Sequence, residues 1–392
     1  MTNFYYTCSE CGRKYNITPD IMVCPECSKM QEPDKPLRGI LEVILRGKTD
    51  KKLSLTGFLP VDNKYFPNIP VGNTPLWKPA ILDKELGFPN LFIKDDTRNL
   101  TGSLKDRASY LVAAFAKREG IREIVVASTG NAASSMAGVG AAAGLNITIF
   151  LPESAPRAKM VQSLQYGARV IMVAGNYDRA FDLSLEFSRK SKNVLSRNTA
   201  YNPLTIEGKK TVSLEIYQTL KRSPDFVFVP TGDGVILGGV YKGFRDLQKL
   251  GFIETIPTII AVQAEGSDAI CKAFQRGEFI ELDAHTVADS ISVGIPRNGY
   301  YALKQLKQYN GKCLTVSDEE ILIAQKELSS KAGLFTEPAA AASYAGFLNI
   351  RAEIPNDATV VLLATGNGLK DIDSAIKGIE FPKKAISSLG EL

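Results

Sequence analysis

The 392-residue chain contains little histidine, little tryptophan and little excess charge of either sign. It has one histidine, His285, and one tryptophan, and its 47 basic and 42 acidic residues leave a formal net charge of +5. One histidine excludes histidine-based triads and histidine-rich catalytic metal sites, because each needs a histidine at a defined place. We expect His285 to be structural or exposed. A general base must then be a lysine, a carboxylate, a tyrosine or a bound water.

Long basic runs and long apolar runs are also missing. Without a basic run, binding to nucleic acid has no electrostatic support. No apolar run approaches the length that crosses a bilayer, and the first residues, Met-Thr-Asn-Phe-Tyr-Tyr, lack the basic and apolar regions of a signal peptide. The sequence therefore predicts a cytoplasmic protein with no nucleic-acid or membrane partner.

Cysteine is scarce except at the N-terminus. Cys8-x2-Cys11 and Cys24-x2-Cys27 form two knuckles separated by a short spacer, which is the spacing of a four-thiolate zinc ribbon. Such a zinc ion is structural, since four thiolates leave no open coordination position. Two disulfides or a metal-free ribbon are the alternatives. Cys271 and Cys313 stand alone in the sequence and are expected to be buried small apolar residues.

The rest of the chain alternates short apolar, β-rich runs with segments of helical length. The runs cover residues 91–93, 124–126, 147–151, 170–173, 226–229, 258–262 and 359–363. Such alternation predicts an α/β fold of βαβ units, with parallel-rich sheets covered by helices. The length allows two domains and an appendage. We expect a zinc-ribbon segment at 1–35, a connector and the start of a large domain at 36–90, a small domain at 91–195 and a large cofactor-binding domain at 196–392.

Three polar loops follow three of these runs directly. They are Ser128-Thr-Gly-Asn131, Thr231-Gly-Asp-Gly234 and Thr365-Gly-Asn-Gly368. Since the carboxyl ends of parallel strands share one edge of a sheet, these loops should gather where open α/β sheets bind ligands. The glycine-rich loop that opens a helix after residue 229 can cradle a phosphate with its N–H groups, although such turns also serve to pack a helix against a strand.

Lys105 lies where an apolar run passes into a helical pattern, in Asn99-Leu-Thr-Gly-Ser-Leu-Lys-Asp-Arg107. The N-terminus of a helix lowers the pKa of a nearby ammonium and favours an anion beside it. A lysine there suits Schiff-base chemistry, in which a neutral amine attacks a carbonyl. The alternative is a salt-bridged lysine, because Asp106 and Arg107 are its neighbours.

The segment 99–107 resembles the cofactor-lysine signature of fold-type II pyridoxal-phosphate enzymes, and most closely that of the threonine synthase family. Four other stretches resemble that family in the same order: residues 128–131, 202–208 (Asn-Pro-Leu-Thr-Ile-Glu-Gly), 232–234 and 365–371. Together they span nearly the whole chain. Many threonine synthases are similar in carrying an N-terminal ribbon.

The resemblance implies a role for each loop. Lys105 would hold pyridoxal phosphate and move protons, and Asn131 and Thr365 would meet the cofactor's phenolic oxygen and pyridine nitrogen. A neutral hydroxyl at the ring nitrogen favours elimination and replacement over transamination. The remaining residues form two sets: Gly232, Asp233, Gly234, Val235 and Ile236 would hold the cofactor's phosphate through N–H groups, with the Asp233 side chain turned away, and Ser128, Thr129 and Gly130 would bind the substrate's α-carboxylate.

Two positions depart from the family pattern. Asn367 stands where threonine synthases typically have histidine, and Thr205 stands where they typically have an arginine that helps to bind the substrate's phosphate. An arginine–phosphate fork is a strong contact, so another cation must replace it or the substrate must differ. The candidates are Arg157, Lys159, Lys209 and Arg297. We favour Arg297, because Pro296 fixes the backbone just before it; a helix-capping or surface-pairing role is the alternative.

The resemblance implies a cytoplasmic, homodimeric lyase of amino-acid biosynthesis that acts on a small amino-acid substrate. Its reaction would convert O-phospho-L-homoserine and water into L-threonine and phosphate by elimination and replacement. A first alternative keeps pyridoxal phosphate and changes the substrate, either to O-phosphoserine in a β-replacement, as in cysteate synthases, or to a hydroxy amino acid in a dehydration. A second alternative is a non-catalytic zinc-ribbon binding protein.

Overall fold

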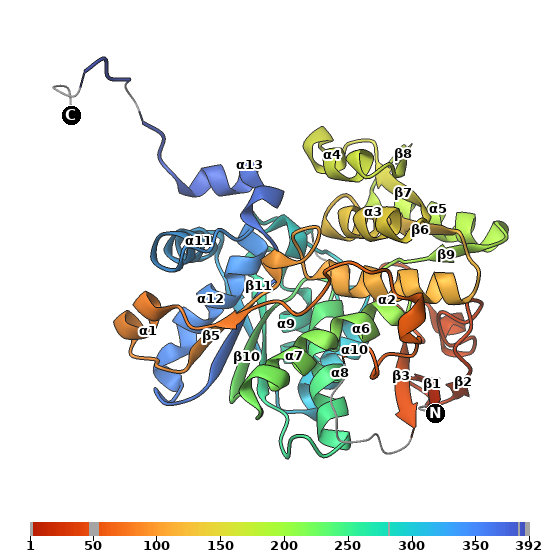
Figure 1. The fold of residues 1–392 in the computed structure, drawn as a ribbon, viewed down its shortest axis with the longest axis horizontal. Helices are drawn as coiled ribbons and strands as arrows, with labels where there is room; N and C mark the ends of the chain where they lie inside the picture. The colour runs from red at the N-terminus through yellow and green to blue at the C-terminus, as the bar shows by residue number, and fades with distance from the viewer. Residues whose placement is uncertain (1–2, 47–54, 281–282, 383–384, 389–392) are drawn as a thin grey trace.

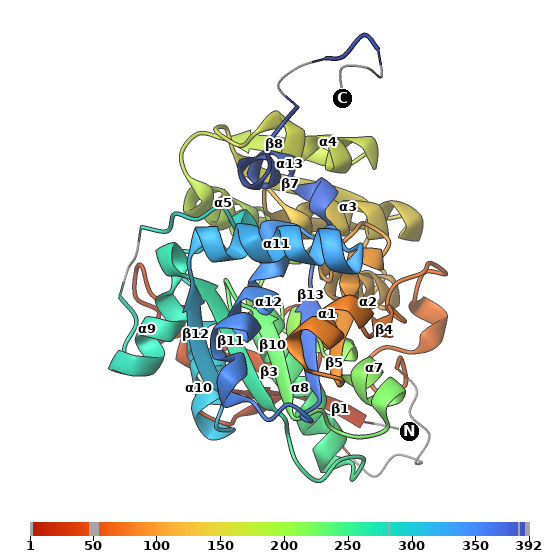
Figure 2. The same ribbon diagram turned by 90° about the vertical axis from the view of Figure 1, so that its left-hand side faces the viewer.

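The computed structural model describes residues 3–46, 55–280, 283–382 and 385–388. Residues 47–54 of the expected connector lie outside the described part. The described chain forms three sheets with covering helices, and the first two views show a small unit of yellow and green elements above a larger one (Figures 1 and 2). The prediction of an α/β fold with parallel-rich sheets is confirmed.

The large sheet has six strands in the order β12-β11-β10-β13-β5-β4. All neighbouring pairs are parallel except β4 with β5. The strands are β4 (Leu76–Trp77), β5 (Leu91–Asp95), β10 (Phe226–Pro230), β11 (Thr258–Ala264), β12 (Lys312–Val316) and β13 (Val360–Ala364). β5 was expected in the small domain, but it pairs with β13, so the polypeptide begins the large sheet before it enters the small one.

Helices bury both faces of this sheet, which explains why its strands are apolar without alternation. On β10, Phe228 packs with the cluster under α11 (Asp318–Ala332) and α12 (Pro338–Ile350), whereas Val227 and Val229 pack with the cluster under α7 (Thr211–Leu220) and α8 (Val235–Lys249). Gly346 on α12 is required by this packing, because a Cβ there would lie 2.6 Å from the Val262 side chain. The remaining helices of this unit are α1 (Ala80–Leu86), α6 (Leu204–Lys209), α9 (Ala269–Arg276), α10 (Gly299–Gln308) and α13 (Ile372–Ala375).

The small sheet has four parallel strands in the order β8-β7-β6-β9. Its elements are β6 (Glu123–Ala127), β7 (Asn146–Pro152), β8 (Arg169–Val173), β9 (Val194–Ser196), α2 (Lys105–Arg118), α3 (Asn131–Ala143), α4 (Arg157–Gln165) and α5 (Tyr177–Lys190). The small-residue run that forms α3 lets this helix lie close to the sheet: a Cβ on Gly140 would clash with the Ile147 side chain.

The N-terminal segment is an antiparallel sheet in the order β2-β1-β3, drawn in red in Figure 1. Its strands are β1 (Asn3–Cys8), β2 (Lys14–Tyr15) and β3 (Leu41–Arg46). The apolar run at 40–45 was expected in the connector, but it forms β3 and pairs with β1 along the whole strand, for example Tyr6 with Val43. The N-terminal unit therefore reaches beyond residue 35.

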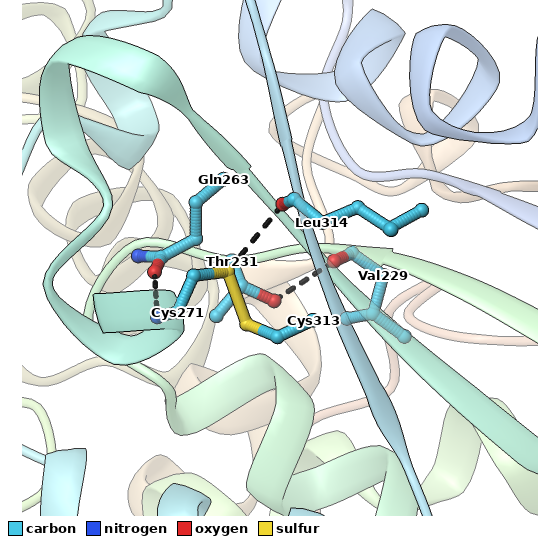
Figure 3. Close-up of a disulfide and its surroundings, with 6 residues drawn as sticks. All are labelled: Val229, Thr231, Gln263, Cys271, Cys313 and Leu314. Atoms are coloured by element: carbon cyan, nitrogen blue, oxygen red, sulfur yellow. Dashed lines mark hydrogen bonds between the residues drawn. A yellow bond between two sulfur atoms is a disulfide. The ribbon is translucent and has the colours of Figure 1, made fainter. Parts of the chain in front are cut away.

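Two cysteines that stand apart in the sequence are joined in the structure. Cys271 on α9 and Cys313 on β12 form a disulfide, with their Cα atoms 5.3 Å apart (Figure 3). The expectation of two separate apolar cysteines is therefore wrong. Their separation of 42 positions in the sequence conceals the pairing, because it depends on how α9 packs beside β12. Figure 3 also shows Thr231, at the start of the glycine-rich loop, beside this bridge.

Among the described residues, no helix is both long enough and apolar enough to cross a membrane. His285 is exposed, with 80% of its side-chain surface accessible, and its Nε2 lies 2.9 Å from a carboxylate oxygen of Asp283, which is also exposed. Its structural or exposed role is confirmed.

Candidate active site

Lys105 is the first residue of α2 and lines a cavity at the carboxyl ends of the large-sheet strands. Two contacts fix the segment before it: the Leu104 N–H donates to the Thr365 carbonyl at 2.9 Å, and Ser103 pairs with Gly366 as an isolated bridge. The lysine is thus tied to the loop after β13. The loops after β10 and β13 meet at one edge of the large sheet, as predicted, whereas the 128–131 loop follows β6 in the small sheet, so the expectation that all three share one sheet edge is wrong. Burial lowers the pKa of Lys105 to about 8, which the neighbouring Glu337 partly offsets.

The glycine-rich loop forms the opposite wall of this cavity. Residues 230–237 line it, between the end of β10 and the first turn of α8. Gly234 has a φ of +82°, and a Cβ on Gly232 would lie 2.8 Å from the Ile291 backbone. No larger residue fits at 232, so the loop brings its backbone close to the cavity. The first N–H groups of α8 lack helical acceptors and suit an anion.

The backbone of the turn at residue 297 holds the Asp233 side chain in place. Its carboxylate accepts a hydrogen bond from the Arg297 N–H, and Oδ2 is buried without a hydrogen-bond partner among the described residues. Burial raises the pKa of this carboxyl, against the effect of the nearby Arg297 and Lys105. The side chain therefore belongs to the wall shared by the cavity and the 297 turn.

Asn131, the first residue of α3, faces a carboxylate that the sequence did not single out. Its amide donates to both oxygens of Glu337, at 3.0 and 2.8 Å, and to the Ser290 hydroxyl at 3.2 Å. Glu337 is 3% exposed and sits directly before α12. Gly366 leaves the space it needs, because a Cβ there would collide with the Glu337 carboxylate. Asn131, Glu337 and the buried Thr365 all line the Lys105 cavity.

A second, wider cavity of about 530 Å³ adjoins the first and shares Asn131, Ser290 and Glu337 with it. Gly130 lines it, and Asn367, the departure from the family pattern, does so as well. In the same loop the Gly130 N–H donates to the Ser128 hydroxyl at 3.2 Å, which shapes the turn between β6 and α3. Ser128 and Thr129 are half-buried, and neither lines either of the two cavities. Of the three residues expected to bind a carboxylate, Gly130 is the one that lines the wider cavity.

Arg297 does not line either cavity. Its guanidinium pairs with Asp178 on α5 and lies 5.1 Å from the centre of the Phe181 ring. Lys159 lines the wider cavity and pairs with Asp289 at 2.6 Å, and Arg157 is exposed on the first turn of α4. Of the four cations proposed to replace the missing arginine, these three are paired or exposed.

Lys209 differs from the other candidates because it is buried, with 1% of its surface accessible. Its ammonium donates to the Thr205 carbonyl at 3.1 Å. The Thr205 hydroxyl is itself engaged, because it donates to the Asn202 carbonyl at 2.8 Å. At position 205, where the family pattern has arginine, the hydroxyl is therefore already hydrogen-bonded. The ammonium of Lys209, one helical turn later, contacts the carbonyl of the same residue.

The residues around Lys105 fit pyridoxal phosphate. A reactive amine, a glycine cradle at a helix N-terminus, a hydroxyl at Thr365 and an amide at Asn131 are the complements of an aldehyde, a phosphate, a ring nitrogen and a phenolic oxygen. Gly232 lies so close to the Ile291 backbone that no side chain fits there, so only backbone is available at this point of the cradle.

The four N-terminal cysteines converge as their spacing predicts. All four sulfur atoms lie within 4.8 Å of one another, and the pairs Cys8–Cys27 and Cys11–Cys24 are both 3.7 Å apart. Four thiolates around one zinc ion, with Zn–S near 2.3 Å, place sulfurs about 3.8 Å apart. The donor set therefore fits tetrahedral zinc.

Comparison with known proteins agrees with this geometry. Residues 68–366 match the family described as pyridoxal-phosphate dependent enzyme. The chain is 35% identical to the threonine synthase of Methanocaldococcus jannaschii, over 96% of this chain and 95% of that one. It is 39% identical to the threonine synthase of Halalkalibacterium halodurans, over 79% of this chain and 86% of that one.

Solved structures share the fold. A threonine deaminase isoform from Solanum lycopersicum superposes with a TM-score of 0.68 at 24% identity, covering 78% of this chain and 86% of that one. Maize serine racemase superposes with a TM-score of 0.68 at 21% identity, covering 78% and 91%.

Proposed function

The chain belongs to the pyridoxal-phosphate-dependent enzymes and, among them, to the threonine synthase family; on that premise we propose that it converts O-phospho-L-homoserine and water into L-threonine and phosphate. The observation that carries the proposal is the meeting of Lys105, the 232–236 cradle and Thr365 in one cavity. These residues come from three separate segments of the chain. Apolar side chains alone would be enough to form a core there, so the stability of the fold does not explain why these groups meet.

When bound, pyridoxal phosphate supplies an aldehyde that reacts with amines and a ring that withdraws electrons from the substrate's Cα. The chain's own residues do the rest. Lys105 would anchor the cofactor, and its Nζ would take the proton from the substrate's Cα and return protons during the later steps. A pKa near 8 keeps a useful fraction of that amine neutral.

The other residues orient and shield the reactants. Backbone N–H groups of residues 232–236 would hold the cofactor's phosphate, Asn131 and Thr365 would hold the ring, and residues 128–130, of which Gly130 lines the wider cavity, would bind the substrate's carboxylate. Glu337 fixes the Asn131 amide, because both of its oxygens accept from that amide. This places the acidic group beside the ring-binding residues, where it positions Asn131.

A substrate panel tests the reaction. O-phospho-L-homoserine, O-phospho-L-serine, L-serine and L-threonine are supplied to the holoenzyme, and released phosphate, ammonia and new amino acids are measured. We expect phosphate and L-threonine in equal amounts from the first compound alone. Phosphate release from O-phosphoserine only, or ammonia from the hydroxy amino acids only, would replace this function with one of its two rivals.

We also propose that one zinc ion binds the four cysteines as a structural element. Closed four-thiolate sites contribute folding free energy and no chemistry. Removing the metal with a chelator should increase proteolytic cleavage within residues 1–46 while the absorbance of the bound cofactor persists. Metal analysis that finds no zinc in protein prepared with zinc would contradict the proposal.

The family resemblance also implies a homodimer and a cytoplasmic location, and both are part of the proposal. Light scattering of the purified holoenzyme measures the first, and a mass near that of one chain would refute it. The Cys271–Cys313 disulfide bears on the second, because disulfides are rare in reducing compartments outside hyperthermophiles. Mass spectrometry of protein trapped with an alkylating reagent in intact cells would show whether the bridge is formed there.

A further inference from the structure

The turn at residues 297–299, which leads into α10, packs against the glycine-rich loop. Three hydrogen bonds join the two segments. The Arg297 N–H donates to the Asp233 carboxylate, the Asn298 N–H donates to the Asp233 carbonyl at 3.0 Å, and the Asn298 amide donates to the Gly234 carbonyl at 2.9 Å. Asn298 is fully buried and lines neither of the two cavities. It therefore contacts the loop from behind, without access to a ligand.

These hydrogen bonds decide where the N–H groups of the loop point. A trans peptide unit is planar, so its C=O and its N–H point in opposite directions. The Asp233 carbonyl shares a peptide unit with the Gly234 N–H, and the Gly234 carbonyl shares one with the Val235 N–H. Both carbonyls point to Asn298, so both N–H groups point away from it, and Gly234 and Val235 line the cavity. The N–H groups of residues 232–236 have no hydrogen-bond acceptor among the described residues, which leaves them free for an anion.

The side chain of Asn298 does not do what an asparagine at this position usually does. Asn298 is the N-cap of α10, where an asparagine side chain ordinarily accepts a hydrogen bond from the N–H groups of its own helix. Here the side chain makes no capping bond, and its Oδ1 is buried without a hydrogen-bond partner among the described residues. Leaving that oxygen unpaired costs free energy. The contact of its amide with the loop is what the side chain gains in return.

Two glycines of the loop and of α8 make room for this contact. A Cβ on Gly238 would lie 2.9 Å from the Asn298 amide nitrogen, and a Cβ on Gly234 would lie 2.9 Å from the Cβ of Ala302 on α10. Glycine at both positions lets α8 begin directly against the turn and against α10. A shift of the turn must therefore move the loop as well.

The N-terminal unit holds the other side of the same turn. The Leu37 N–H donates to the Arg297 carbonyl at 3.0 Å. Pro36 packs on Gly299, where a Cβ would lie 2.9 Å from the proline ring. The turn is thus fixed between residues 36–37 on one side and the glycine-rich loop on the other.

Further contacts join this segment to α10 and to the cysteine cluster. The Arg38 guanidinium lies 4.4 Å from the centre of the Tyr300 ring, on the first turn of α10. The Gly39 carbonyl accepts a hydrogen bond from the Cys24 N–H at 2.8 Å. A continuous set of contacts therefore runs from the cysteine knuckles through residues 36–39 and the 297–299 turn to the loop at 232–236.

We propose that Asn298 is a positioning residue for the cradle of the cofactor's phosphate, and that residues 36–38 of the N-terminal unit hold Asn298 in place. The N-terminal unit then has a use besides its own fold, because it supports the cofactor site from outside. The inference rests on the proposed function in the identity of the cofactor alone, and it holds for any substrate.

The test compares two compounds that differ in one group. Pyridoxal has the ring and the aldehyde of pyridoxal 5′-phosphate but no phosphate, so the ratio of the two dissociation constants reports on the cradle. Apoenzyme of the full chain is titrated with each compound, and absorbance gives the constants. A general loss of stability weakens the binding of both compounds and leaves the ratio unchanged.

Three variants are compared with the parent. Asn298→Ala removes the amide that holds the Gly234 carbonyl, and Leu37→Pro removes the N–H that holds the turn. Asn90→Ala is the matched control: its amide also donates to a backbone carbonyl, at 3.0 Å, but it precedes β5 at the opposite end of the large sheet.

For Asn298→Ala we expect the dissociation constant of pyridoxal phosphate, divided by that of pyridoxal, to rise about tenfold, which is the effect of losing one hydrogen bond. Leu37→Pro should raise the ratio about threefold, because it acts on the loop through the turn. Asn90→Ala should keep the parent's ratio. The phosphorus resonance of the bound cofactor should shift in the first two variants and not in the third. With cofactor in large excess, the site of every variant should still fill.

A parent's ratio in Asn298→Ala would overturn the positioning role, and a parent's ratio in Leu37→Pro alone would overturn the role of the N-terminal unit. If Asn298→Ala does not fold, Leu37→Pro decides: a raised ratio supports the proposal and the parent's ratio refutes it. A parent that binds both compounds equally well would refute the cradle itself. The titration uses no amino-acid substrate, so a failed substrate panel changes none of these outcomes and is recognised separately.

Discussion

Two clusters of buried basic side chains lie on either side of α2, and they differ in how their charges are met. On one side, Arg107 donates to Asp96 at 2.6 and 2.8 Å and to Glu215 at 2.6 and 2.7 Å. Lys94 adds a bond to Glu215 at 2.6 Å, and the Thr74 hydroxyl completes the set. Two cations meet two carboxylates, all of them buried.

On the other side, Lys105 lines a cavity with Asp233 and Glu337, and neither Lys105 nor the nearby Arg197 and Lys209 makes an ion pair among the described residues. The first network ties β5, α2 and α7 together, since Lys94, Arg107 and Glu215 belong to these elements. In the second cluster, Lys105, Asp233 and Glu337 line a cavity, and the one strong contact there is that of Glu337 with the Asn131 amide. The comparison teaches that two uses of buried charge differ in whether each charged group has a partner within the protein. A network in which every charge is paired stabilises the fold, whereas a cluster with unpaired charges binds a ligand.

The largest effect should come from the incomplete cluster. Lys105→Ala removes the amine that anchors the cofactor and moves the Cα proton, so we expect the turnover number to fall by at least about four orders of magnitude. Circular dichroism and the unfolding midpoint should stay close to the parent's. Borohydride reduction of the parent, followed by peptide mapping, should label Lys105. A label on another lysine would remove Lys105 from the mechanism.

The completed network should respond in stability. Arg107→Met leaves two buried carboxylates with one cation, which costs about 3–5 kcal/mol of unfolding free energy for a buried pair that loses one partner. Urea unfolding followed by circular dichroism measures it. Glu215 carries part of the penalty, because Arg107 and Lys94 hold its pKa at about 2. Unchanged stability together with lost activity would place Arg107 in the active site and break the comparison.

The pH dependence of cofactor binding should report the incomplete cluster directly. Burial lowers the pKa of Lys105 from its ordinary value of 10.5 to about 8, and only the neutral amine reacts with the aldehyde. The rate at which apoenzyme regains bound cofactor should therefore rise about tenfold per pH unit below 8 and level off above it. Stopped-flow absorbance measures this rate. A rise that continues to pH 10 would show an unperturbed lysine.

The smallest effect should have the opposite sign from that of Arg107→Met. Lys209→Met replaces a buried cation that has one carbonyl partner by an apolar chain of similar length, so the free energy of unfolding should stay equal or rise by about 1 kcal/mol. The same urea experiment measures it. A decrease of several kcal/mol in the free energy of unfolding would mean that Lys209 stabilises the fold, as Arg107 does.

The sequence predicts most of the fold and the frame of the site. The runs at 226–229 and 359–363 became β10 and β13 to within a residue, and their polar loops met at one edge, because strand length, turn residues and parallel pairing are local signals joined by one geometric rule. Lys105 was predicted for the same reason, because the residues next to it in the sequence show the change from a strand to a helix.

What the sequence did not predict depends on distant packing. Glu337 reads as an ordinary residue before a helix, and only its contact with Asn131 reveals a role. Arg197 follows β9, whose three residues are too short a run to signal a strand, so its position at the sheet edge was missed. The disulfide of Cys271 and strand β3 were missed likewise, because each needs a partner far along the chain.

The place of β13 in the large sheet has a consequence for how the protein is made. This strand comes from residues 360–364, yet it lies between β10 and β5 in the interior of the sheet. A nascent chain on the ribosome therefore has β5 and β10 available long before the strand that must separate them. Until β13 emerges, their edges are free to pair wrongly, and Leu104 has no Thr365 carbonyl to receive its N–H. The protein therefore becomes able to catalyse its reaction only late in synthesis, when β13 inserts between β5 and β10.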